Sequence, residues 1–132
     1  MGIVVLGAIF VDIKGYPMAN YIPQGRNAGI VKHVHGGVSR NVVEDIANVE
    51  LRPTFVSLVD DTGVGADVLT KLRNHKVDTR FIRHRPDGMG TWLAIFDNDG
   101  DVYASISKRP DLLPLCKNPP KKNLSVLLRS YN

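Results

Sequence analysis

The sequence has few of the features that mark secreted or membrane proteins. Its 132 residues include a single cysteine, Cys116, so an internal disulfide cannot form and a disulfide-built secreted scaffold is excluded. No apolar run reaches the roughly 18 residues that a membrane-spanning helix needs. The first residues contain no basic region, and Asp12 ends their apolar stretch, so no signal peptide is expected. These absences predict a cytoplasmic protein with no membrane partner.

The distribution of charge along the chain argues against a nucleic-acid partner. The net charge is +4, from 17 basic and 13 acidic residues. Positions 116–132 hold four of the basic residues and no acidic one, which leaves 13 of each sign in positions 1–115. A nucleic-acid-binding domain would carry its basic excess within the folded part. We therefore expect no nucleic-acid partner.

Positions 1–115 alternate between short β-branched runs and helical segments. The apolar patterns predict strands at 3–6 and 54–59, helices at about 40–49 and 65–74, a strand-like piece at 80–83, a hairpin at 91–96 and 102–106, and an irregular β excursion at 13–35. This order predicts an α/β fold with a parallel sheet, flanking helices and antiparallel additions. The parallel sheet is incomplete, because few strands of that type are evident.

Two short motifs could indicate a protease or a metal site. Asp61-Thr-Gly63 after an apolar strand is the nucleophilic triplet of aspartic proteases, which makes a homodimeric protease a remote alternative. Val64 stands where a hydroxyl residue is usual, and a helical segment follows, so a turn between strand and helix is the better interpretation. His33-x-His35 could supply two metal ligands, but no third ligand follows at a plausible spacing. We expect no metal site.

The pair Gly36-Gly37 at the start of a predicted helix indicates a binding site. Glycine lets a ligand approach the backbone closely, and the free N–H groups of a first helical turn can donate to ligand oxygens. Asn41 lies one turn further on and offers both a donor and an acceptor. Asp12, just past the end of the first predicted strand, is expected at the carboxyl edge of the sheet, where α/β proteins bind ligands. Such a carboxylate suits neighbouring hydroxyl groups.

In combination, these motifs resemble the N-terminal portion of the ribokinase-like (PfkB) family of carbohydrate and nucleoside kinases. The segments that carry the resemblance occur in the family's order at 7–12, 36–47, 56–63, 69–79 and 91–100, and cover residues 1 to about 115. Gly15-Tyr16 and the stretch from Gly37 to Asn41 are most similar to pseudouridine kinases. The sequence departs from the family pattern at Asp60 and Lys76, where glycine is common.

The resemblance implies a ribokinase-like core and a small β-sheet lid formed around 13–35 and 91–106. It also implies ATP-dependent phosphorylation of a sugar hydroxyl, with ATP and Mg²⁺ as cofactors of the intact enzyme, and a homodimer joined through the lid. The partner is then a small-molecule sugar or nucleoside. The substrate-binding positions carried over are Asp12, Gly36, Gly37, Asn41 and, on the lid, Thr91.

The resemblance stops before the part that performs catalysis. In the family the catalytic Asp, the anion hole and the ATP site lie in the C-terminal half, and nothing in residues 116–132 matches them. We therefore expect no catalytic residue in this chain, no tightly bound cofactor and no activity of the chain alone. The basic tail at 116–132 is interpreted as a frameshifted or truncated end. The alternative function is a non-enzymatic fragment that dimerises through its lid or binds a ligand.

Overall fold

The computed structural model describes residues 2–117 and 125–129. One set of strands comprises β1 (Ile3–Leu6), β4 (Thr54–Val59), β5 (Ile82–His84) and β8 (Ser125–Arg129). A second set comprises β2 (Phe10–Pro17), β3 (Gly29–Gly36), β6 (Gly90–Phe96) and β7 (Val102–Lys108). The helices of the described residues are α1 (Val38–Asn48), α2 (Gly63–Asn74) and α3 (Leu113–Lys117).

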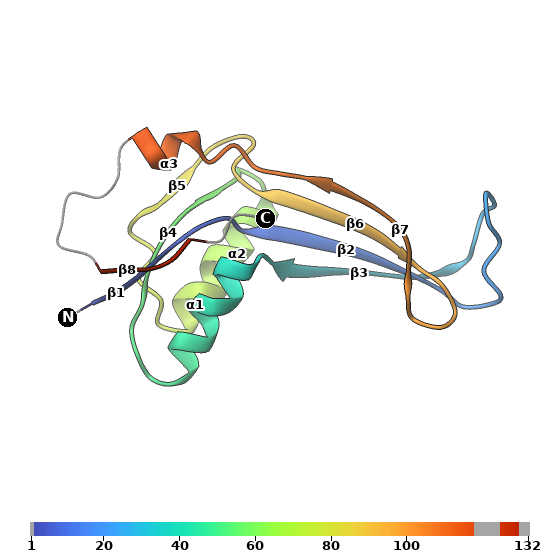
Figure 1. The fold of residues 1–132 in the computed structure, drawn as a ribbon, viewed down its shortest axis with the longest axis horizontal. Coiled ribbons are helices and arrows are strands. Elements are labelled where there is room, and N and C mark those ends of the chain that lie inside the picture. The colour runs from blue at the N-terminus through green and yellow to red at the C-terminus, as the bar shows by residue number, and fades with distance from the viewer. Residues whose placement is uncertain (1, 118–124, 130–132) are drawn as a thin grey trace.

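These strands form two sheets that differ in topology. The core sheet has the order β5-β4-β1-β8, and its neighbouring strands are parallel. The lid sheet has the order β3-β2-β6-β7, with β2 and β6 parallel at its centre and an antiparallel strand on each side. Figure 1 shows the core sheet and the helices at one end of the molecule, with the lid sheet extending away from them as a long arm.

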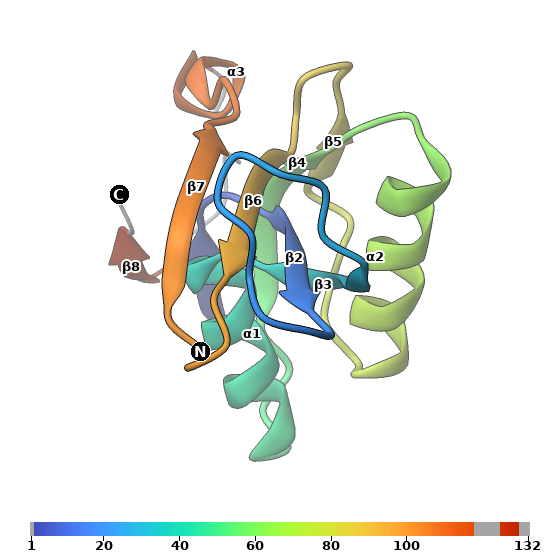
Figure 2. The ribbon, with the colours of Figure 1, turned by 90° about the vertical axis from the view of Figure 1, so that its right-hand side faces the viewer.

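The core sheet is buried on both faces because its strands alternate apolar side chains between two layers. One face packs against α1 and α2 in a cluster that includes Val5, Phe55 and Val59. The other face contributes Val4, Val56 and Leu58 to a smaller cluster with Leu115 of α3. Figure 2 shows α3 at the top of the molecule, apart from α1 and α2. The predicted α/β class with flanking helices is confirmed.

The lid sheet also has two faces, set by the register of its strands. Asp12 pairs with Val34 on β3 and with Trp92 on β6, and paired residues point to the same side of a sheet. We call this side the Asp12 face; it also carries the side chains of Lys14, Tyr16, Ala94 and Phe96. The opposite side, here called the aliphatic face, carries Ile13, Val31, Leu93, Ile95 and Ile106.

The observed bounds agree closely with several predictions and correct others. Strands 3–6 and 54–59 occur as predicted, and the hairpin at 91–106 is β6 and β7. The predicted irregular excursion is two regular eight-residue strands, β2 and β3. Asp12, predicted just beyond the first strand, lies inside β2 because the chain enters the lid sheet only three residues after β1 ends.

The segment predicted as a tail contributes to the core sheet. Within 116–132 the structure describes the end of α3 and the strand β8, which pairs in parallel with β1. The sequence pattern predicts no such strand, and the remainder of that segment lies outside the described residues. Among the described residues, no helix has the length and apolar character needed to cross a membrane.

Candidate functional site

The candidate site begins where β3 meets α1, and its first element is the contact between Asp12 and Gly36. A Cβ added at position 36 would lie 2.6 Å from Asp12 Oδ2 and 2.8 Å from Oδ1. The carboxylate is therefore packed directly on the buried backbone of Gly36, and a larger residue would displace it. Two residues that are 24 positions apart in the sequence, both predicted for this site, are thus brought together.

Gly37 turns the chain from β3 into α1 and requires glycine for two reasons. Its φ of 98° lies in the region that L-residues rarely adopt, and a Cβ there would lie 2.7 Å from the carbonyl oxygen of Ala8. Within the described part of the chain, no side chain caps this helix start. The glycine backbone at this helix start therefore lets an oxygen-rich ligand approach closely beside Asp12.

Asn41 lies at the same end of α1, and Arg40 holds its side chain in place. Arg40 Nη1 donates to Asn41 Oδ1 at 3.0 Å and to the carbonyl oxygen of His35 at 3.2 Å, while Nη2 donates to Glu44 Oε2 at 2.7 Å. The Asn41 side chain is exposed, so its amide group remains accessible to a ligand. Sequence reasoning did not select Arg40, although it lies between the glycine pair and Asn41.

The electrostatic setting of Asp12 combines burial with nearby positive charge. Partial burial raises the pKa of its carboxyl group above the usual value, and the charges of Lys14 and Arg40 act in the opposite direction without cancelling the rise. Hydrogen-bond donors stabilise a partly desolvated carboxylate, because its oxygen atoms accept hydrogen bonds. Two adjacent sugar hydroxyls supply two such donors. The position therefore fits a polyol ligand.

Thr91, the lid residue predicted for the site, lies on a different face from Asp12. Its register partner is Val11, which places its side chain on the aliphatic face of the lid sheet. The next residue, Trp92, pairs with Asp12 instead. The structure therefore brings Asp12, Gly36, Gly37 and Asn41 to one region, with Trp92 rather than Thr91 beside the carboxylate.

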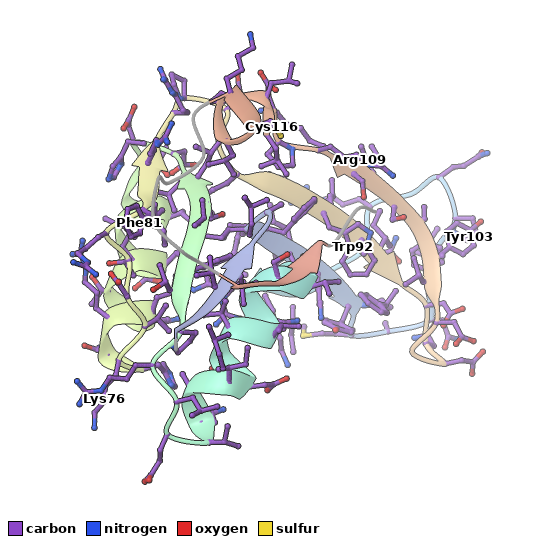
Figure 3. All side chains as sticks on the ribbon, turned by 60° about the vertical axis from the view of Figure 1, so that its left-hand side comes forward. Lys76, Phe81, Trp92, Tyr103, Arg109 and Cys116 are labelled. Atoms are coloured by element: carbon purple, nitrogen blue, oxygen red, sulfur yellow. The ribbon has the colours of Figure 1, made fainter. Side chains whose placement is uncertain are left out.

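Aromatic side chains on the Asp12 face were also missed by sequence reasoning. Trp92 contacts Phe96 edge-on with ring centroids 6.4 Å apart, and Phe96 stacks on Tyr16 with centroids 4.6 Å apart. Figure 3 shows Trp92 on the lid sheet. The available signal was the alternation of residues after Asp12 and Thr91, which puts every second side chain on one face. The pairing of β2 with β6 could not be inferred from that alternation.

The side chains of the motifs that suggested other chemistry make contacts separate from those of Asp12 and Asn41. Asp61 is exposed in the turn before α2, where its Oδ1 lies 3.4 Å from His84 Nδ1. His35 Nε2 lies 3.1 Å from Asp67 Oδ2, whereas His33 is exposed. In residues 2–117 and 125–129, no group of three or more His, Cys, Asp or Glu side chains could hold a metal ion.

Comparison with known proteins shows what the chain is similar to. No protein-family model matches the chain. The chain is 38% identical over 110 residues to guanosine-inosine kinase of Exiguobacterium acetylicum, which covers 83% of the chain and 36% of that protein. It is also 24% identical over 106 residues to pseudouridine kinase of Escherichia coli, covering 80% and 34% of the two sequences. The chain is homologous to the N-terminal portion of ribokinase-like (PfkB) carbohydrate and nucleoside kinases.

Solved structures agree on the ribokinase-like fold. Ribokinase of Thermotoga maritima superposes with a TM-score of 0.70 at 16% identity, over 82% of this chain and 36% of its own. Arabidopsis thaliana ribokinase, solved with ribose and ATP, gives a TM-score of 0.68 at 18% identity, over 81% and 35%. The chain thus spans about a third of the length of the relatives it matches. The predicted ribokinase-like resemblance is confirmed.

Proposed function

We propose that this chain supplies the sugar-hydroxyl-binding site and the lid of an ATP-dependent carbohydrate or nucleoside kinase. The observation that carries the proposal is the carboxylate of Asp12, packed on Gly36 next to the start of α1. The homologous guanosine-inosine and pseudouridine kinases support the reaction class.

The proposed roles follow from the chemistry of each group. Asp12 accepts hydrogen bonds from two neighbouring hydroxyls, and the backbone at Gly36 and Gly37 lets the sugar approach without a clash. The amide of Asn41 donates to or accepts from a further hydroxyl. Thr91, which faces away from Asp12, stays a prediction for the lid. Holding the sugar in one orientation is the contribution that this part makes to phosphoryl transfer.

ATP and Mg²⁺ are cofactors expected of the whole kinase, and the described residues do not fit them. They contain no group of side chains able to hold a metal ion, and the sequence has no Gly-Lys-Ser/Thr phosphate loop. We therefore assign the ATP site and the catalytic base to the part of the kinase that this chain does not match. The chain alone is inferred to be catalytically inactive, and its cytoplasmic location stays a prediction.

Calorimetric titration of the purified chain with ribose and with inosine tests the binding role. Asp12→Asn is expected to weaken binding of both ligands at least tenfold, whereas Asp45→Asn, which changes an exposed carboxylate on the same helix as Asn41, leaves binding unchanged. Equal binding by the two variants would reject the site. A parallel assay for ATP-dependent phosphorylation is expected to give no product; product formation by the purified chain would reject its inferred inactivity.

The aliphatic face supports a second, non-catalytic role in dimerisation. It exposes several large apolar side chains, namely Val31, Leu93, Ile95 and Ile106, which a second copy of the chain could cover. Sedimentation should then show concentration-dependent association that Ile106→Lys abolishes. Val49→Lys is the matched control, because Val49 is similarly exposed but lies at the far end of α1. Association unaffected by Ile106→Lys would exclude this face.

A further inference from the structure

Arg40 lies where β3 leads into α1, and its side chain contacts three acceptors. Nη1 donates to the carbonyl oxygen of His35 at 3.2 Å and to Asn41 Oδ1 at 3.0 Å, and Nη2 donates to Glu44 Oε2 at 2.7 Å. Only 12% of the Arg40 side chain is exposed. The guanidinium is therefore fixed between the end of β3 and the first two turns of α1, which follow each other directly in Figure 1.

The contact between Arg40 and Asn41 does not follow from helix geometry alone. Adjacent residues of a helix point about 100° apart, whereas residues four apart share a face. Arg40 therefore lies naturally over Glu44. A planar guanidinium carries its N–H donors in a rigid fork, so one nitrogen can serve Glu44 while the other serves Asn41. The ion pair with Glu44 thus orients the fork toward Asn41.

This contact decides which end of the Asn41 amide meets a ligand. Arginine only donates hydrogen bonds, so the amide atom that faces Arg40 has to be the oxygen, Oδ1. The amide nitrogen, Nδ2, then lies on the side turned away from Arg40, and it carries two donors and no acceptor. Because the Asn41 side chain is exposed, this nitrogen is accessible to a ligand. Asn41 is thereby prepared as a donor, whereas the carboxylate of Asp12 is an acceptor.

Burial of the guanidinium strengthens this arrangement. Arg40 Nε is buried and has no hydrogen-bond partner in the described part of the chain, so little water competes at the base of the fork. An exposed asparagine loses side-chain freedom when it binds a ligand, which weakens binding. In this chain Arg40 removes that freedom on folding, so the ligand meets a donor that is already oriented.

We propose that Arg40 is a positioning residue that fixes the amide of Asn41 as a hydrogen-bond donor to the ligand. The proposal rests on the proposed function and deepens it, because the site then offers an acceptor at Asp12 and a donor at Asn41. Hydroxyl groups suit both residues, since a hydroxyl donates as well as accepts. Arg40 acts through Asn41 and does not itself touch the ligand, and Glu44 supports it from the next turn of α1.

A double-mutant cycle on the purified chain tests whether Arg40 acts through Asn41. Ribose affinity is measured by calorimetric titration for the wild type, Arg40→Met, Asn41→Ala and the double variant. Each single variant should bind ribose about five- to tenfold more weakly, and the double variant no more weakly than Asn41→Ala, because Arg40 then has no amide to orient. Equal losses from Arg40→Met in the two backgrounds would overturn the proposal.

Arg80→Met is the matched control for the loss of an arginine. Arg80 also pairs with a carboxylate, since its Nη2 lies 2.8 Å from Asp78 Oδ2, and it lies in the segment between α2 and β5. Its replacement should leave the affinity for ribose unchanged.

Two further substitutions separate positioning from charge. Burial raises the pKa of Asp12 and the charge of Arg40 opposes that rise, so Arg40 could also act on Asp12 directly. Arg40→Lys keeps the charge without the fork, and its affinity should stay close to that of Arg40→Met; wild-type affinity would overturn the positioning role. Asn41→Asp can still accept from Arg40 but has no N–H to donate. It should bind ribose no better than Asn41→Ala, and wild-type affinity would overturn the donor role.

NMR relaxation of the Asn41 side-chain nitrogen tests the same claim without a ligand. The amide should be rigid in the wild type and in Arg80→Met, and mobile in Arg40→Met. An amide that stays rigid in Arg40→Met would overturn the proposal. If Arg40→Met does not fold, Arg40→Gln, which also lacks the charge and the fork, replaces it in both measurements.

The outcomes separate this proposal from the function on which it rests. If Asp12→Asn weakens ribose binding and Arg40→Met does not, the proposed site stands and the role of Arg40 is rejected. If the wild-type chain does not bind ribose, the proposed site is rejected and the positioning role with it.

Discussion

The core sheet and the lid sheet of this chain are stabilised in different ways. In the core sheet, side chains such as Phe55 and Leu58 are fully buried between helical layers. In the lid sheet, every residue of β7 is exposed, and few side chains, such as Ala94, are fully buried. The lid sheet is therefore held mainly by its hydrogen-bonded strand pairs, while the core sheet is held by burial of apolar surface.

This difference indicates which part of the molecule is free to respond to a ligand. Regions with few buried apolar contacts open at a lower free energy than the core, and any ligand that binds the closed form stabilises them. One face of the lid sheet carries a carboxylate and aromatic rings, and the other carries aliphatic side chains. This arrangement fits the proposed binding of a ligand on the first face and of a second copy of the chain on the other.

The largest expected effect is the loss of a core side chain. Phe55→Ala removes a fully buried ring from the cluster between the core sheet, α1 and α2, and should lower the free energy of unfolding by about 3–5 kcal/mol. Ile106→Ala on the exposed lid strand should lower it by less than about 0.5 kcal/mol. Urea denaturation of both variants checks this; similar losses would show that the lid sheet contributes to stability as the core does.

Replacing the glycine at the junction between the two sheets should lower the stability of the protein. Gly37→Ala forces a side chain into a positive-φ conformation and against the Ala8 carbonyl oxygen, and should cost about 1–3 kcal/mol of stability. Gly100→Ala, in the turn between β6 and β7, also has a positive φ but would meet no atom within 4 Å. Thermal melts should therefore rank Gly37→Ala as the more damaging variant, and the reverse ranking would contradict the close approach at the junction.

The contact between β3 and α2 should make stability depend on pH. Burial lowers the pKa of His35 below its usual value; Lys71 and Arg40 act in the same direction, and Asp67 opposes them. Because the unfolded chain then binds the proton more readily, stability is highest above pH about 6.5 and falls as the pH drops toward the folded-state pKa. His35→Gln should flatten this slope in urea titrations, and an unchanged slope would contradict the effect of His35 burial.

The smallest expected effect is a gain of stability at the binding site itself. Because burial raises the pKa of Asp12, its ionised form is disfavoured in the folded state, and its contribution to stability declines as the pH rises through that pKa. Asp12→Asn should therefore raise the melting temperature slightly at pH 7 even as it removes ligand binding. Asp45→Asn should leave the melting temperature unchanged, and a lower melting temperature for Asp12→Asn would contradict the desolvation argument.

The sequence predicted the features that depend on local interactions. The buried strands at 3–6 and 54–59 follow from short β-branched runs, and the hairpin of β6 and β7 follows from its Asp/Asn/Gly turn. The meeting of Asp12 with Gly36 was suggested by family resemblance. Their close packing became visible only with the antiparallel pairing of β2 and β3.

Long-range pairing accounts for what the sequence could not predict. Asp12 and Trp92 become neighbours through parallel pairing of strands that are 80 residues apart, and no local pattern encodes that register. The strand β8 was missed because its five residues follow a proline-containing segment and gain their order from pairing with β1. The aromatic surface beside the carboxylate is therefore a property of the fold that local sequence patterns do not display.

We infer that the junction of β2, β3 and α1 binds a sugar-containing ligand beside the Asp12 face. The most direct test is to map the changes that a ligand causes in the backbone amide NMR signals. Titration with inosine should shift the signals of Asp12, Gly36, Gly37, Asn41 and Trp92, with little change along the core strands β4 and β5. Shifts confined to the core or to the aliphatic face, or no shifts at saturating ligand, would contradict the account.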